Sequence, residues 1–101
     1  MPKARVDLRP LLHRVAEALQ LRASERGNRI VLALPTALPE VLGADDELAQ
    51  VFQNLLDNAI KYGRPGGEIT IDAATVIRSS ARFVSIAVRD RGEGIAREHL
   101  S

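Results

Sequence analysis

The sequence predicts an α+β fold, a two-layer α/β sandwich in which two helices cover one face of a mixed sheet. Apolar residues recur at every third or fourth position in two stretches, 10–26 and 45–62, as in helices with one buried face. Strand-like apolar runs follow each of these stretches. The length of 101 residues fits one domain, and 46% hydrophobic with 27% charged residues is the composition of a chain that can bury a core.

The first half of the chain predicts a short extended segment, a helix and a strand. Val6-Asp7-Leu8 is the extended segment, and a helix over 10–26 is expected because Pro10 is tolerated in a first helical turn and Gly27 ends the pattern. Residues 30–34 are apolar on both faces of a strand, which predicts a strand covered on both sides. A short connector over 40–43, with room for a strand of two or three residues, comes next.

The second half predicts a helix and a hairpin. The three acidic residues that open the stretch 45–62 suit a helix N-terminus, and the run Gly63-Arg64-Pro65-Gly66-Gly67 ends the helix. Two strands are expected at about 68–77 and 82–90, joined by a hairpin at 78–81. No element is assigned to the seven residues after Gly94.

Charge and residue usage exclude several classes of function. The net charge is +1, so no overall field attracts nucleic acid or an anionic membrane. The absence of Cys excludes disulfides, thiolate zinc sites and cysteine nucleophiles. His13 and His99 lie far apart and lack the spacing of zinc ligands. The longest apolar run, 30–34, is far shorter than the ~20 residues of a membrane span.

A polar face on the helix 45–62 is the first candidate site. At about 100° per residue, Asn54, Asn58, Lys61 and Tyr62 share one side of this helix, opposite its apolar residues. A solvated surface is the ordinary explanation of such a face. Asn is a poor helix former, however, and two of them one turn apart indicate a ligand. An amide oxygen can bind Mg²⁺, and a Lys nearby can offset phosphate charge.

The second candidate site is the run Asp90-Arg91-Gly92-Glu93-Gly94-Ile95 at the end of an apolar strand. A carboxylate in this position can accept a hydrogen bond from an exocyclic amine. Gly92 and Gly94 permit positive φ and the close approach of a flat ligand. Taken alone, this run is equally compatible with an ordinary glycine turn.

In this order and spacing, the two runs resemble the sensor histidine kinases. Residues 50–62 resemble the N box of that family, and residues 90–95 resemble its first glycine box. The start of the chain, from 6–8 through 42–45, also resembles the start of the family's ATP-binding domain, so the likeness covers nearly the whole chain. The resemblance implies a Bergerat-type ATP-binding fold, shared with gyrases and heat-shock chaperones.

The resemblance also implies a role for each candidate residue, with ATP bound between the N-box helix and the sheet. At the phosphate end, Asn58 would bind Mg²⁺, Asn54 would lie near the phosphates and Lys61 would pair with a phosphate. Tyr62 would line the nucleotide pocket. At the adenine end, Asp90 would accept a hydrogen bond from the amino group. The residues that shape the pocket there would be Gly92, Gly94 and Ile95. The sequence contains no P-loop.

The family's domain continues beyond its first glycine box into a lid, a second glycine box and closing elements. We therefore expect residues 1–101 to be a single, C-terminally truncated ATP-binding domain that is inactive alone. The phospho-accepting His would lie on a separate dimerisation domain, because the surroundings of His13 do not match. The parent would act in the cytoplasm, free or as part of an inner-membrane sensor, and would pass the phosphoryl group to a response regulator. The strand at 82–90 would have an open edge, and we expect a homodimer through it.

Three alternatives to a histidine kinase remain open. Gyrase-type and mismatch-repair ATPases share the fold but have a Glu that activates water where this chain has Asn54, and an amide cannot accept a proton. Serine kinases that act on anti-sigma partners are harder to exclude. A non-catalytic adaptor or degenerate kinase domain is the third alternative, against which the intact set of candidate residues argues.

Overall fold

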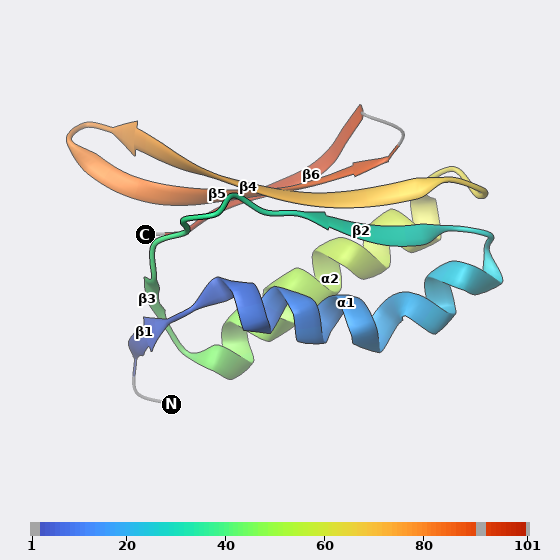
Figure 1. Ribbon diagram of the computed structural model, residues 1–101, viewed down its shortest axis with the longest axis horizontal. Helices are drawn as coiled ribbons and strands as arrows, with labels where there is room; N and C mark the ends of the chain where they lie inside the picture. The colour runs from blue at the N-terminus through green and yellow to red at the C-terminus, as the bar shows by residue number, and fades with distance from the viewer. Residues whose placement is uncertain (1–2, 91–92, 101) are drawn as a thin grey trace.

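Two layers make up the molecule, with both helices on one face of the larger sheet (Figure 1). The computed structural model describes residues 3–90 and 93–100, with the backbone alone for 93–99. The expected α+β sandwich is confirmed. Its elements are, in order, β1 (Ala4–Val6), α1 (Leu8–Glu25), β2 (Arg29–Ala33), β3 (Val41–Gly43), α2 (Asp45–Tyr62), β4 (Glu68–Arg78), β5 (Ala81–Asp90) and β6 (Glu93–Leu100).

The larger sheet is mixed and has the strand order β2-β4-β5-β6. β2 runs parallel to β4, with Ile30 opposite Ile69, and the other two pairs are antiparallel. β1 and β3 form a separate antiparallel pair at one end of the helices. Among the described residues, no helix has the length and apolar character needed to cross a membrane.

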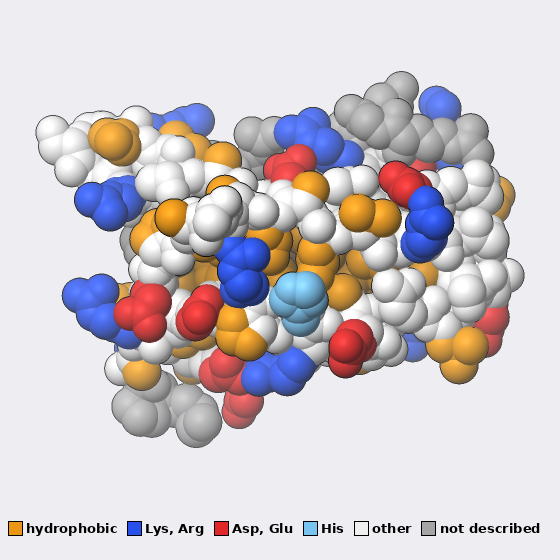
Figure 2. Space-filling view, viewed as in Figure 1, with side chains coloured by type: hydrophobic (Ala, Val, Ile, Leu, Met, Phe, Trp, Pro, Cys, Tyr) orange, Lys and Arg blue, Asp and Glu red, His pale blue; other side chains and the backbone are white. Residues whose placement is uncertain are grey.

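The core lies between the helices and the inner face of the sheet. Leu12 of α1 and Leu56 of α2 are fully buried, and so is Ile69 of β4. Figure 2 shows hydrophobic side chains between the two layers, with basic and acidic side chains interspersed around them. Only Ile30 is buried within β2, so the expectation of a strand covered on both sides is wrong. The reason is that the helices cover only one face of the sheet, and Val31, on the other face of β2, is only half-buried.

α1 begins two residues earlier than the sequence predicted. Asp7 is its N-cap, and the Asp7 carboxylate accepts a hydrogen bond from the Arg9 backbone N–H at 3.1 Å. The cap therefore sets the start of the helix, and Pro10 lies inside the first turn. α2 has the predicted bounds, 45–62.

The hairpin between β4 and β5 is confirmed. Ser79 and Ser80 both have positive φ, 50° and 63°, as a tight two-residue hairpin turn requires. The hairpin end projects beyond the helices (Figure 1).

The expected open edge at 82–90 is wrong, because β6 pairs with residues 84–90 of β5. In the register, Val88 lies opposite Ala96 and Val84 lies opposite Leu100, with an irregularity between Val88 and Arg89. An unpaired apolar strand leaves backbone N–H and C=O groups without partners, and residues 93–100 supply those partners. The basis for a homodimer through the edge of β5 is thereby removed.

Candidate functional site

The four candidate residues of α2 lie on its exposed face. Asn54, Asn58, Lys61 and Tyr62 are all exposed, and Tyr62 is 73% accessible. The opposite face of α2 is fixed in the core by Phe52, among others, so packing determines which way the polar face points.

Asp90 differs from these residues because it is buried, at 7% exposure, as the last residue of β5. Its Oδ2 accepts a hydrogen bond from the Arg64 backbone N–H at 2.8 Å. Its Oδ1 is also buried and has no hydrogen-bond partner among the described residues. Buried carboxylate oxygens are rarely left without a donor, so Oδ1 is suited to a donor that a ligand brings.

The loop after α2 brings Asp90 close to the C-terminal end of that helix. A β-carbon built on Gly63, the residue after Tyr62, would lie 3.3 Å from Asp90 Oδ2. The structure thus joins the end of β5 to the end of α2. Of the remaining candidates, Gly92 lies outside the described residues, and Gly94 and Ile95 belong to β6, where Gly94 is opposite Arg89.

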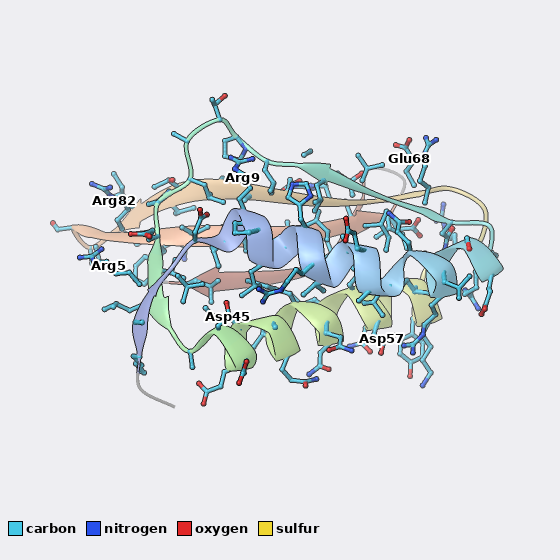
Figure 3. The ribbon with its side chains drawn as sticks, turned by 60° about the horizontal axis from the view of Figure 1, so that its bottom comes forward. Arg5, Arg9, Asp45, Asp57, Glu68 and Arg82 are labelled. Carbon is cyan, nitrogen blue, oxygen red and sulfur yellow. The ribbon has the colours of Figure 1, made fainter. Side chains whose placement is uncertain are left out.

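A hollow of about 370 Å³ opens between the C-terminal halves of the two helices. Its lining residues are Arg22, Arg26, Asp57, Asn58, Ile60 and Lys61. Asp57 forms an ion pair with Arg22 across it, and Figure 3 shows Asp57 on α2 beside α1. Asp90 does not line this hollow. Asn58 and Lys61 therefore border the α1 side of α2, while Asp90 lies at the sheet side.

Local partners hold two of the polar side chains of α2. The Asn54 Oδ1 accepts a hydrogen bond from Gln50 Nε2 at 3.0 Å, one turn earlier. The Lys61 ammonium lies 5.3 Å from the centre of the Tyr62 ring, within the range of a cation–π contact. Both contacts are between exposed groups, so a ligand can replace them at small cost.

Asn58 fits a magnesium ion that arrives with phosphates. Mg²⁺ usually keeps several waters and takes its other oxygens from substrate phosphates and one or two protein groups. Asn58 offers an exposed amide oxygen beside Lys61 at the rim of the hollow. The described part of the chain contains no group of three or more His, Asp or Glu side chains placed to hold a metal ion.

The contacts that position the candidate residues have no signal in the sequence. The donor to Asp90 is the backbone N–H of Arg64, and every residue except Pro has such a group. The pairing of Arg22 with Asp57 joins residues of two different helices, and no local pattern predicts it. Nothing in the sequence alone could have found either contact.

The fold is an α+β sandwich with a mixed sheet, and it places a polar face on α2 and the buried Asp90 carboxylate near the end of that helix. The chain belongs to the family described as histidine kinase-, DNA gyrase B-, and HSP90-like ATPases, which matches residues 43–101.

Individual relatives are protein kinases. The chain is 42% identical over 96 residues to the adaptive-response sensory kinase SasA of Synechococcus elongatus, covering 95% of this chain and 24% of that protein. It is 34% identical over 98 residues to the signal transduction histidine-protein kinase BaeS of Escherichia coli, covering 97% of this chain and 20% of that protein. The chain therefore spans a quarter or less of the length of these two relatives.

Solved structures agree with the fold. Full-length ShkA in complex with AMPPNP superposes with a TM-score of 0.74 at 35% identity, covering 93% of this chain and 19% of that chain. The cytoplasmic segment of the histidine kinase QseC superposes with a TM-score of 0.73 at 23% identity, covering 89% of this chain and 54% of that chain, and this second likeness concerns the fold alone.

Proposed function

We propose that this chain is the ATP-binding part of a sensor histidine kinase. The observation that carries the proposal is the buried Asp90 carboxylate, with one oxygen held by the Arg64 N–H and the other without a donor among the described residues. Adenine has an exocyclic amine that can supply that donor. The identity to sensory and histidine-protein kinases over nearly the whole chain supports the same function.

The residues of this chain would bind and orient the nucleotide. Asp90 Oδ1 accepts a hydrogen bond from the adenine amine, and Lys61 leaves the Tyr62 ring to pair with a phosphate. Asn54 would lie near the phosphates, and the family resemblance assigns Gly92, Gly94 and Ile95 to the adenine end. Asn58 would hold Mg²⁺, and the ion would offset the negative charge of the phosphates.

The whole protein would use this nucleotide for phosphoryl transfer in the cytoplasm. The γ-phosphoryl group passes from ATP to a histidine nitrogen on a separate dimerisation domain, and ADP leaves. A response-regulator aspartate then takes the phosphoryl group from the histidine. Asn54 favours transfer over hydrolysis, because its amide cannot accept a proton from water.

Nucleotide titrations followed by NMR test the assignment of the two ends. Asp90→Asn should weaken ADP and Mg²⁺-ATP alike, by about tenfold or more, because a hydrogen bond to a charged group is lost. Asn58→Ala should weaken Mg²⁺-ATP and leave magnesium-free ADP unchanged.

Asp72→Asn is the matched control, since Asp72 is a half-buried carboxylate of β4 paired with Arg89 at 2.5 Å, outside the site. It should bind both nucleotides as the wild type does. Wild-type affinities in both Asp90→Asn and Asn58→Ala would contradict the proposed site.

A further inference from the structure

The loop between α2 and β4, residues 63–67, is held by the turn between α1 and β2. The Gly66 N–H donates to the Arg26 carbonyl at 3.1 Å, and the Arg29 N–H donates to the Gly67 carbonyl at 2.9 Å. The two backbones come close together, since a β-carbon built on Gly27 would lie 3.5 Å from the Gly66 α-carbon. Two segments almost forty residues apart in sequence therefore form one unit.

Asn28 adds a buried side chain to this unit. It is 4% exposed, and its Oδ1 accepts a hydrogen bond from the Gly67 N–H at 3.0 Å. Its Nδ2 is buried without a hydrogen-bond partner among the described residues. A buried amide with a donor left over is a poor source of stability. The hydrogen bond that Asn28 accepts comes from the loop, so we expect Asn28 to fix the position of the loop more than to stabilise the fold.

The other end of the same loop holds Asp90. Arg64, three residues before Gly67, donates its backbone N–H to Asp90 Oδ2 at 2.8 Å. The two oxygens of a carboxylate are fixed relative to each other. Holding Oδ2 therefore sets the direction in which Oδ1 can accept a hydrogen bond.

We propose that Asn28 is a positioning residue for adenine recognition: it fixes the loop through Gly67, and the loop fixes Asp90 through Arg64. The inference rests on the nucleotide site proposed above. It concerns selectivity, because a 6-amino purine donates to Asp90 Oδ1, whereas a 6-oxo purine presents a carbonyl oxygen that the carboxylate repels. A correctly aimed Asp90 discriminates between the two bases, and a loosely held one discriminates less.

The test compares dissociation constants for ADP and inosine diphosphate, measured by NMR titration. Asn28→Leu removes the accepting oxygen and keeps the branched shape of the side chain. It should weaken ADP by about three- to tenfold, the effect of one neutral hydrogen bond, and change inosine diphosphate much less. The exchange of the Arg64 amide with solvent should also become faster. Asn28→Asp keeps the accepting oxygen and should restore most of the ADP preference.

A control variant tests whether lower stability alone reduces the preference for ADP over inosine diphosphate. Val15→Ala is the control, because Val15 is buried in the middle of α1, far along the helix from the loop. It should lower stability without changing the preference for ADP. If Asn28→Leu does not fold, Asn28→Ser replaces it, since the shorter hydroxyl cannot reach the Gly67 amide from the same position.

Asp90→Asn separates this inference from the proposed function. If Asp90→Asn loses the preference for ADP while Asn28→Leu keeps both the preference and the slow exchange of the Arg64 amide, the role of Asn28 is refuted and the nucleotide site stands. If Asp90→Asn itself keeps the preference, the nucleotide site is wrong and the inference falls with it.

Discussion

Gly63 shows how closely α2 and Asp90 approach each other. Its backbone, at φ −77° and ψ 175°, is one that any residue can adopt. A β-carbon there would nevertheless lie 2.3 Å from the Ala59 carbonyl oxygen, and this carbonyl accepts the Gly63 N–H that ends α2. The absence of a side chain therefore allows the last turn of α2 to close beside the carboxylate.

A comparison of two glycines tests this interpretation. Gly63→Ala forces the loop to move and should cost about 1–3 kcal/mol, as overpacking does. Gly66→Ala should cost a similar ~1–2 kcal/mol for a different reason, the positive φ of 79°, and it has open space around its β-carbon. Urea denaturation measures both costs. In an NMR titration, Gly63→Ala should weaken ADP more than Gly66→Ala does, and equal ADP affinities in the two variants would contradict the interpretation.

For single residues, the sequence indicated which side chains are candidates for the site, but it did not indicate which groups they contact. Asp90 stood out because a carboxylate followed by two glycines ends an apolar strand. That one oxygen of Asp90 is held and the other left for a donor depends on the N–H of Arg64, 26 residues away in sequence. Asn28 follows Gly27, and Asn is common in turns. The neighbouring sequence therefore gave no sign of its buried contact with the loop.

The elements were predictable where hydrophobic periodicity is strong. α2 has the predicted bounds because its apolar residues repeat through the whole helix. β6 was missed because residues 93–100 do not alternate, and several of them, such as Ala96 and Leu100, favour helices. Pairing with the apolar strand β5 outweighs that local preference.

The helices are held to each other and to the sheet by apolar packing more than by charge. Leu56 of α2 is fully buried, so Leu56→Ala should cost about 2–5 kcal/mol of unfolding free energy. The ion pair of Arg22 with Asp57 joins the same two helices, but these side chains are 57% and 39% exposed. Arg22→Ala should therefore cost less than ~1 kcal/mol. Urea denaturation measures the free energy of unfolding of both variants. Comparable losses of that free energy would show that the ion pair is essential to the helix layer.

For the whole molecule, the strand that forms the edge of the sheet determines whether copies of the chain can pair with each other. The order β2-β4-β5-β6 places β6 at one edge of the sheet and β5 inside it. Residues 84–88 of β5 carry no charge, whereas 93–100 include two Glu and one Arg. Charged residues on an edge strand oppose pairing with another chain. β6 thus replaces an apolar edge with a charged one, and we expect the chain to be a monomer.

Detaching β6 should reverse that behaviour. Ala96 lies opposite Val88, and Ala96→Pro removes a backbone N–H and restricts φ in the middle of the edge strand. The apolar edge of β5 would then be exposed, and the variant should form larger species as its concentration rises. Light scattering over about a hundredfold range of concentration measures this, and hydrogen exchange at Val84 and Val88 should become faster.

The same position supplies the control for this prediction. Ala96→Val places a residue with high strand propensity in β6 and keeps the N–H, so it should remain monomeric with slow exchange in β5. A monomeric Ala96→Pro with unchanged exchange would show that β6 does not protect β5. A wild-type chain that self-associates as readily as Ala96→Pro would show that the charged strand does not prevent pairing. Self-association confined to Ala96→Pro follows only if the pairing of β6 with β5 keeps copies of the chain apart.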